Sequence, residues 1–218
     1  MIRIGPIETF GWEAAIRGMR NSYASWDKSD SGWCGKDFKG MDIFVLGPND
    51  KELAEHLAAS GGSHSKFRRM IHAQMDISAP LYWWKEFDTY KVGTTANSTS
   101  TMHSIMKKEF SVEDFAQGDL MDSLEGMHLI ATVNVLNKLR EKYLKANEEK
   151  WKKLYWSGVI RLLPESYMQL RTIDVNYEVL SRMVNERKNH KLDEWVEFCK
   201  KVAEEVPYAK TLILSKRS

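Results

Sequence analysis

Residues 70–77 alternate between apolar and polar side chains with a period of two. The apolar positions are Ile71, Ala73, Met75 and Ile77, and the polar positions between them are His72, Gln74 and Asp76. Successive side chains of a strand point to opposite faces, so this pattern predicts a strand with one buried face and one face open to water or ligand. Short strands are also predicted over residues 1–8, ending at Pro6, and over 211–214, and residues 41–46 read as a strand or an extended connection.

Other stretches place apolar residues three and four apart, which is typical of a helix with one buried face. Helices are predicted over residues 12–19, 49–60, 80–86, 124–153, 173–187 and 192–205. The longest, 124–153, is expected to be one helix, with Gly158 and Pro164 bracketing the connection to the next. Residues 26–40 and 114–118 are expected to be loops or connections.

The helix expected over 173–187 carries polar residues on an apolar face. Asn176, Leu180, Met183 and Arg187 are spaced by four, three and four, so they share that face. A buried Asn or Arg needs a partner, because an unpaired one is costly. That partner is either another helix of the chain, through a hydrogen bond or salt bridge, or a ligand.

A stretch rich in hydroxyl and amide groups follows the aromatic residues 82–87. Its members are Thr94, Thr95, Asn97, Ser98, Thr99, Ser100 and Thr101. We expect a loop whose hydroxyls and backbone N–H groups, with Lys85 and Lys91 upstream, bind phosphate and sugar oxygens. Trp83 or Trp84 would stack on a planar ring of the ligand. The alternative interpretation is a solvated Ser/Thr linker.

The composition is that of a globular protein: 218 residues, 43% hydrophobic and 28% charged. The length is enough for one domain with a sizeable core or for two small ones. The 32 basic and 30 acidic residues give a net charge of +2, which favours neither a nucleic-acid nor a membrane partner. Cys34 and Cys199 lie far apart, and no metal-ligand spacing is present, so we expect no disulfide framework and no metal site. No signal-peptide pattern is seen, and a cytoplasmic location is expected.

Four segments, in order and approximate spacing from Ser60 to Pro207, resemble the flavin-dependent thymidylate synthases. Ser60-Gly-Gly-Ser-His64-Ser65 resembles that family's Gly-His-x-Ser segment. Ala79-Pro80, aromatic residues and Lys85-Glu86 stand where the family has a proline and an Arg-Gln pair, ahead of its signature Arg-His-Arg-x-x-Ser-x-Asn-Glu-x-Ser-x-Arg-Tyr. Leu163-Pro164 resembles its Arg-x-x-Leu-Pro segment. Asn176-x-Glu178 with Arg187 resembles its Asn-x-Arg with a second Arg eleven residues after the Asn.

The resemblance implies a single domain over residues 1–218 with a mixed α/β (α+β) fold, a helix bundle with a small mixed or antiparallel sheet. It implies a homotetramer whose active sites lie between subunits. It also implies FAD as cofactor, a pyrimidine nucleotide of the uridine class as substrate, and methylenetetrahydrofolate and NADPH as co-substrates. In that chemistry the flavin carries the hydride and the one-carbon unit, so no protein nucleophile is required.

Carried over residue by residue, the resemblance implies two sets of binding residues. The nucleotide-binding residues would be Lys85, Glu86, Thr99, Ser100 and Arg187. The cofactor-binding residues would be His64, Ser65, Arg68, Arg69, Lys91, Thr94, Asn97 and Asn176. The basic run of residues 66–69 could touch phosphate, or could equally cap a helix or meet a neighbouring subunit.

The signature itself is degenerate. With Asn97 taken as the signature Asn, the family's Arg-His-Arg becomes residues 90–92, Tyr-Lys-Val, and its final Arg-Tyr becomes residues 102–103, Met-His. Counted from Pro80 instead, Lys91 falls on the last Arg of the triplet and Thr94 on the first Ser. Glu178 replaces a further Arg of the family.

Two hypotheses follow from this mixture. The chain is either a divergent enzyme that methylates a uridine nucleotide or a close relative, or a nucleotide-binding or scaffold protein that has kept the fold and lost the reaction. The retained hydroxyl-rich stretch and the Asn176 and Arg187 pair favour the first. The near erasure of the signature favours the second.

Overall fold

The computed structural model describes residues 2–36, 40, 42–116 and 124–214. The α-helices are α1 (Trp12–Arg20), α2 (Pro48–Ser60), α3 (Leu81–Phe87), α4 (Thr101–Ser104), α5 (Leu124–Lys145), α6 (Glu149–Leu162), α7 (Tyr177–Arg187), α8 (Asp193–Glu205) and α9 (Ala209–Leu212). The strands are β1 (Arg3–Ile4), β2 (Glu8–Phe10), β3 (Gly32–Lys36), β4 (Asp42–Val45), β5 (His72–Pro80), β6 (Thr94–Ser98) and β7 (Met168–Asn176). Short 3₁₀ helices are η1 (Asn21–Tyr23), η2 (Trp26–Lys28), η3 (His64–Met70) and η4 (Val112–Asp114).

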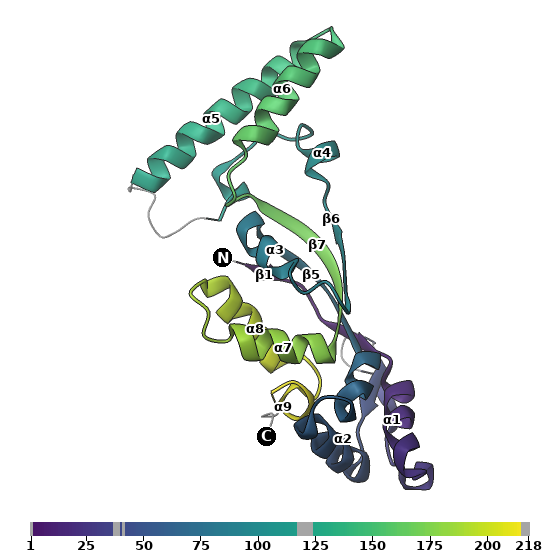
Figure 1. Cartoon of the computed structure of the whole chain (residues 1–218). Coiled ribbons are helices and arrows are strands. Elements are labelled where there is room, and N and C mark those ends of the chain that lie inside the picture. Colours follow the sequence, from purple (N-terminus) through teal and green to yellow (C-terminus); the bar gives the residue numbers. More distant parts are fainter. Residues whose placement is uncertain (1, 37–39, 41, 117–123, 215–218) are drawn as a thin grey trace. The chain divides into compact units, whose positions relative to one another are not determined.

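The strands form two sheets. The larger has the order β1-β5-β7-β6, with β2 also paired to β5, and the smaller pairs β3 with β4 (Figure 1). Both β1 and β2 run antiparallel to β5, with Ile4 opposite Ile77 and Thr9 opposite Ala73. Helices together with a small antiparallel sheet confirm the predicted α+β class.

The alternation over residues 70–77 is confirmed in β5. Ile71, Ala73 and Ile77 are fully buried, whereas Gln74 and Asp76 are exposed. The strand runs to Pro80, which precedes α3 with extended backbone angles instead of lying in the first turn of that helix. Proline suits this place because it has no N–H to give to either element.

The chain divides into two compact units. Unit 1 comprises Met1–Ile4, Ile77–Thr89 and Asn97–Thr172, and unit 2 comprises Gly5–Asp76, Tyr90–Ala96 and Ile173–Ser218. The division falls within β5, β6 and β7, so each of these strands contributes to both units. A single functional domain over residues 1–218 stays a prediction.

In unit 1, α5 and α6 lie side by side as a hairpin (Figure 1). Their apolar stripes meet, and Leu136 and Val159 are fully buried between them. The prediction of one helix over 124–153 is therefore wrong, because an antiparallel pair buries both stripes whereas one straight helix would leave them in water. Gly158, expected in a connection, lies inside α6, where a Cβ would stand 3.3 Å from a Leu139 methyl group. The missing side chain lets the two helices approach.

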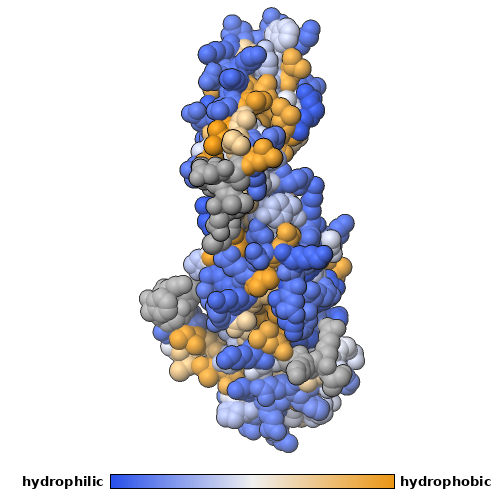
Figure 2. All heavy atoms as spheres, turned by 90° about the vertical axis from the view of Figure 1, so that its left-hand side faces the viewer, coloured by the Kyte–Doolittle hydropathy of each residue, from blue (hydrophilic) through white to orange (hydrophobic). Residues whose placement is uncertain are grey.

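The hairpin also presents apolar side chains to the outside, and Figure 2 shows them gathered on its surface. Leu124, Met127, Val135, Leu154 and Leu162 are each between 45% and 80% exposed. Five large apolar residues on one hairpin make a patch of the kind that marks an interaction surface.

The aromatic residues of α3 form part of the unit 1 interior. Trp83 and Trp84 are fully buried, and their rings meet edge to face at a centroid distance of 4.8 Å. The Trp84 indole N–H donates to the Gln169 carbonyl at 3.0 Å, and the Arg171 guanidinium lies 4.3 Å from its ring. The expectation that one of these tryptophans stacks on a ligand is wrong, because the protein's own groups enclose both.

Unit 2 is built around the buried side chains Trp12, Tyr177, Leu180, Trp195 and Phe198. The helix predicted over 173–187 begins only at Tyr177, because β7 continues to Asn176. The strand predicted over 211–214 is wrong. The N–H groups of Thr211 and Leu212 bond to the Tyr208 carbonyl, which makes the short helix α9.

The hydroxyl-rich stretch is not a loop throughout. Residues 94–98 form β6, which lies at the end of the strand order, and residues 101–104 form α4. Threonine suits strands, and an edge strand tolerates polar side chains because water can reach it. In the same way residues 32–36, expected in a loop, form β3. Residues 42–45 form β4, the first of the two alternatives expected for residues 41–46. Residues 37–39 and 117–118 of the expected loops lie outside the described residues.

Cys34 is exposed and Cys199 buried, and neither forms a disulfide. Burial raises the pKa of the Cys199 thiol to about 12. Among the described helices, none has the length and apolar character needed to cross a membrane.

Candidate functional site

A cavity of about 840 Å³ lies in unit 2, between α1, η1, α2 and η3. Its lining comprises Ala14, Arg17, Gly18, Met19, Asn21, Ser22, Tyr23, Leu57, Ser63, His64, Lys66, Phe67, Arg69 and Met70. Four of these residues are basic, namely Arg17, His64, Lys66 and Arg69, and none of the lining residues is acidic. We call this site the basic cavity.

One wall of the basic cavity is α1, an amphipathic helix. Its apolar stripe, Trp12, Ala15, Ile16 and Met19, is buried. Arg17 lies off that stripe and is exposed, so the helix that anchors itself in the core carries a cation to the cavity.

The facing segment is η3, which has one buried side and one exposed side. Ser65, Phe67 and Arg68 are buried, whereas His64, Lys66 and Arg69 are exposed. The exposed three line the basic cavity and Phe67 contributes to its floor. The short helix thus serves as a core element on one side and as a cationic surface on the other.

The positive charge of the cavity is not neutralised by the chain. Arg17, Lys66 and Arg69 form no ion pair with any residue that the structure describes. Asn21, Ser22 and Ser63 add neutral hydrogen-bonding groups, and Tyr23 adds an exposed ring. Guanidinium and ammonium groups bind phosphate by charge-assisted hydrogen bonds, so this lining suits an anionic ligand that also carries a planar ring.

Two of the predicted cofactor-binding residues, Ser65 and Arg68, turn away from the cavity. An Nη of Arg68 lies 2.5 Å from Glu178 Oε2, and the Ser65 hydroxyl donates to the same oxygen at 3.1 Å. Arg68 also donates to the Leu212 carbonyl at 2.8 Å. Glu178, which stands where the resembled family has an Arg, therefore neutralises the buried Arg68. The structure gives these residues a role in joining η3 to α7 and the C-terminal segment.

Four other predicted cofactor-binding residues also lie outside the lining of the basic cavity. Asn176 is buried and caps α7, where its side-chain oxygen accepts from the Val179 N–H at 3.0 Å. The Thr94 hydroxyl donates to the Tyr90 carbonyl. Lys91 and Asn97 are exposed.

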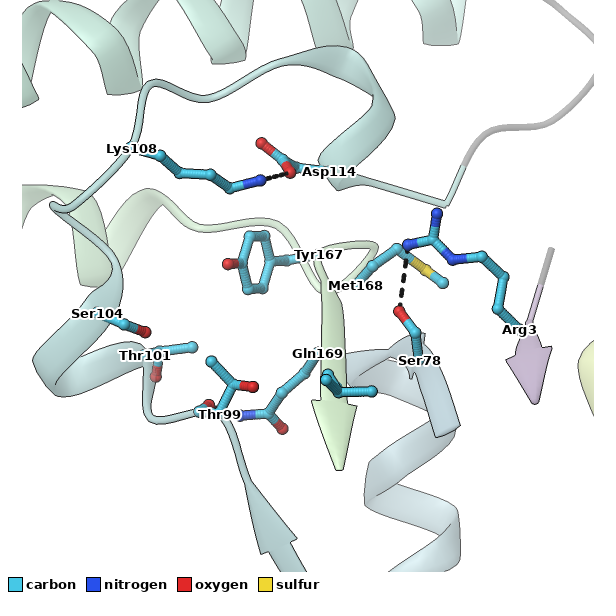
Figure 3. A pocket seen from close by; sticks show the side chains of 11 residues that line it. Arg3, Ser78, Thr99, Thr101, Ser104, Lys108, Asp114, Tyr167, Met168 and Gln169 are labelled. Carbon is cyan, nitrogen blue, oxygen red and sulfur yellow. Dashed lines mark hydrogen bonds and ion pairs between the residues drawn. The ribbon is translucent and has the colours of Figure 1, made fainter. Parts of the chain in front are cut away.

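The predicted nucleotide-binding residues are spread over both units. Lys85 is exposed and pairs with Glu165 at 2.6 Å, and Glu86 is half-buried. The Ser100 carbonyl accepts from the Ser104 N–H at 3.0 Å in the first turn of α4. Thr99 lines a second cavity, in unit 1 (Figure 3).

The fifth predicted nucleotide-binding residue, Arg187, is held by the protein. Its Nε donates to the Tyr90 hydroxyl at 3.0 Å, and that hydroxyl donates to Glu186 at 2.7 Å. The guanidinium also lies 5.2 Å from the Trp195 ring. Burial and the hydrogen bond to Glu186 raise the pKa of Tyr90, so the phenol stays neutral. Arg187, the polar residue at the end of that helix face, therefore has a hydrogen-bond partner within the chain, the Tyr90 hydroxyl.

Sequence reasoning missed the polar residues that α1 and η1 contribute to the basic cavity, namely Arg17, Asn21, Ser22 and Tyr23. The sequence feature that could have indicated them is the polar side of the helix predicted over 12–19, together with the polar residues that follow this helix. No cluster of three or more potential metal ligands occurs within the described part of the chain.

No family model matches the chain, and no curated protein matches it significantly in sequence. Solved structures do match. Flavin-dependent thymidylate synthase ThyX from Helicobacter pylori, complexed with FAD and dUMP, has a TM-score of 0.70 at 17% identity, covering 97% of this chain and 97% of that one. A second structure of ThyX from that organism with FAD and dUMP has a TM-score of 0.71 at 16% identity, with 98% and 97% covered. The UMP/dUMP methylase PolB from Streptomyces cacaoi, bound with 5-Br dUMP, has a TM-score of 0.57 at 14% identity, with 97% and 91% covered.

Proposed function

We propose that this chain, which has the fold of the flavin-dependent thymidylate synthases, is a flavoprotein of cytoplasmic nucleotide biosynthesis that methylates a pyrimidine nucleotide of the uridine class. The basic cavity carries the proposal, because His64 and Arg69, assigned to the cofactor from the sequence, line it together with Arg17 and Lys66. The structural neighbours support it: the ThyX structures contain FAD and dUMP, and PolB is a methylase of UMP or dUMP.

The lining of the basic cavity fits FAD. The cofactor carries two phosphate groups, and the cavity offers three permanent cations and no carboxylate. Its volume of about 840 Å³ lies in the range of small-molecule and cofactor sites. Arg17, Lys66 and Arg69 would hold the diphosphate, His64 would donate to an oxygen of the cofactor, and Tyr23 would pack on one of its rings.

Bound FAD would supply the transfer of hydride and one-carbon unit, with NADPH as reductant and methylenetetrahydrofolate as donor. The chain's own task is then to bind, orient and exclude water. That division explains how the reaction could survive a degenerate signature, since losing one phosphate contact weakens binding without removing a reacting group.

Substitution in the basic cavity tests the proposal. Lys66→Gln and Arg69→Gln should each weaken FAD binding by roughly tenfold, the value of one charge-assisted phosphate contact. Both side chains are exposed, so the unfolding curves should stay unchanged. FAD affinity is measured by the absorbance and fluorescence of the flavin during titration. Lys200→Gln, which removes an exposed lysine of α8, is the matched control and should bind as the parent does. Equal affinity in all four proteins would place the flavin elsewhere.

The homotetramer is proposed from the resemblance, and the exposed apolar face of the α5–α6 hairpin would supply one of the interfaces that it needs. Two of the five residues named above, Val135 and Leu162, also line a groove together with His128, Ala131, Thr132 and Pro164. Its occupant would be the hairpin of a second copy, because two antiparallel hairpins bury such faces by forming a four-helix bundle.

Sedimentation velocity should give a species of about 101 kDa, four times the chain mass of 25.3 kDa. Leu162→Glu should produce smaller species, because a carboxylate would be buried in the interface without a partner. Val92→Glu replaces an apolar residue that is 84% exposed in unit 2, and it should leave the assembly intact. A monomeric or dimeric parent protein would refute the tetramer.

A second candidate function is nucleotide binding without catalysis. It is favoured by two contacts within the chain, Arg187 with Tyr90 and Arg68 with Glu178. In these contacts two arginines that the sequence assigned to ligands bind other side chains of the protein. The absorbance spectrum of purified protein, with FAD added if it is colourless, separates the two. Flavin peaks that bleach with NADPH, followed by methyl transfer to a uridine nucleotide, support the enzyme. Protein that binds nucleotide but ignores FAD supports the second candidate.

A further inference from the structure

A second cavity, of about 390 Å³, lies wholly within unit 1 (Figure 3). Segments far apart in the sequence line it: β1, the end of β5, the residues around α4, η4 and the start of β7. Only Thr99 of its lining was assigned to a ligand from the sequence. We call it the hydroxyl cavity, after the side chains described next.

Three hydroxyl groups face the hydroxyl cavity with no hydrogen-bond partner among the residues that the structure describes. They belong to Thr99, Thr101 and Tyr167. Figure 3 shows the Tyr167 ring reaching toward Thr101 and Ser104. Each hydroxyl can donate one hydrogen bond and accept others, so three of them around one space suit a ligand that has hydroxyl groups of its own.

Tyr167 is the best placed of the three. Its ring packs edge to face on Phe115 at a centroid distance of 5.7 Å, which fixes its direction. Burial, and then the charge of Asp114, raise the pKa of its phenol. The Tyr167 phenol is therefore a neutral donor at physiological pH. None of the described residues accepts its hydrogen bond.

The cavity also carries one excess positive charge. Lys108 and Asp114 form an ion pair across it, so their charges cancel. Arg3 remains, and of its five N–H groups one donates to the Ser78 hydroxyl at 3.3 Å. The Arg3 side lies opposite the threonine hydroxyls in Figure 3, so a cationic side and a hydroxyl-rich side face each other.

We propose that the hydroxyl cavity binds a pentose 5-phosphate, with Arg3 holding the phosphate and Thr99, Thr101 and Tyr167 holding the sugar hydroxyls. Met168 and Leu170 line the same cavity and offer an apolar surface to the C–H groups of the sugar. The volume accommodates a sugar phosphate, and the single excess positive charge favours an anion. The ligand is either a free sugar phosphate or the sugar phosphate of a nucleotide, and only the second source depends on the proposed function.

Calorimetric titration of the full chain with ribose 5-phosphate, UMP and uridine tests the site. Ribose 5-phosphate should bind, and UMP should bind at least as tightly if the nucleotide is the source. Uridine, which lacks the phosphate, should bind roughly tenfold more weakly than UMP. Binding of ribose 5-phosphate with exclusion of UMP would identify a free sugar phosphate as the ligand.

Two variants assign the binding to this cavity. Tyr167→Phe keeps the ring and removes only the free hydroxyl, and should weaken ribose 5-phosphate binding about fivefold. Arg3→Gln changes an exposed side chain and should weaken it about tenfold or more. Lys200→Gln, which removes an exposed lysine of α8, should have no effect on ribose 5-phosphate binding. No heat with ribose 5-phosphate, or parental affinity in both Tyr167→Phe and Arg3→Gln, would overturn the proposal. Because FAD binding is read separately, a protein that does not bind added FAD but binds ribose 5-phosphate would refute the flavoprotein and keep this site.

Discussion

Replacing Glu178 by alanine is expected to lower the free energy of unfolding by about 3 kcal/mol, the lower end of the cost of breaking a buried ion pair. The Arg68 side chain is only 1% exposed, and the Glu178 carboxylate lies 2.5 Å from it. Without that carboxylate a guanidinium would remain in the interior with its counter-charge removed, and Ser65 would lose an acceptor. The expected loss is not larger because Glu178 is 18% exposed, so water can reach the vacated position.

Urea denaturation followed by tryptophan fluorescence measures this loss, and a chain of this length should melt roughly 6–12 °C lower. Glu165→Ala is the matched control: it removes a carboxylate from an exposed pair with Lys85 and should cost less than about 1 kcal/mol. Replacing both partners, Arg68→Met with Glu178→Leu, should restore much of the stability because no buried charge remains. Equal losses in Glu178→Ala and Glu165→Ala would show that the Arg68 pair is open to solvent.

The sequence predicted those elements whose two faces differ chemically within a short stretch. The alternation around β5 is such a case, because Ile71, Ala73 and Ile77 had to share a buried face if the segment was extended. The helices α1, α2 and α8 were predicted for the same reason, with a three- and four-residue apolar spacing. Local periodicity decides these elements, and little tertiary information is needed.

Local periodicity failed where one pattern continues across a turn. The apolar spacing of α5 runs on into α6, and residues 146–148, Ala-Asn-Glu, contain neither Gly nor Pro to interrupt it. What breaks the helix is the gain from packing its two halves against each other. Gly158 was assigned to a connection because glycine disfavours helices, yet its lack of a side chain is what admits Leu139.

Asn176 shows how helical spacing can mislead at a helix end. It lies four residues before Leu180, which fits a helix face, but its side chain accepts the Val179 N–H as an N-cap. The cap preference of asparagine would have placed the start of α7 at Tyr177.

The candidate site was only partly predictable. The resemblance around His64 led to η3, and His64 and Arg69 do line the basic cavity. The resemblance could not show that Arg68 faces inward, because the direction of this side chain depends on its ion pair with Glu178, which lies in a distant segment. Arg17 carries no local mark either, because it becomes part of a site only when α1 packs beside η3.

Gly11→Ala is expected to have the other large effect, a loss of about 3–5 kcal/mol from backbone strain together with overpacking. Gly11 has φ of +87°, a conformation that side chains rarely adopt, and a Cβ there would stand 2.0 Å from the Met70 carbonyl oxygen. That oxygen belongs to the backbone, so no side-chain rotation can relieve the clash. The glycine also precedes α1, and its carbonyl accepts the Ala15 N–H at 3.1 Å.

Gly35→Ala separates the two causes of this loss. Gly35 also has positive φ, at +66°, but a Cβ there would meet nothing within 4 Å, so only the conformational cost of about 1 kcal/mol is expected. Both variants are compared by urea denaturation and by FAD titration. Because Gly11 sets the approach of α1 to the end of η3, its substitution should also weaken FAD binding in the protein that remains folded, whereas Gly35→Ala should leave FAD binding as in the parent. A Gly11→Ala protein as stable as Gly35→Ala would mean that α1 and η3 do not meet as closely as described, and the walls of the basic cavity would have to lie further apart.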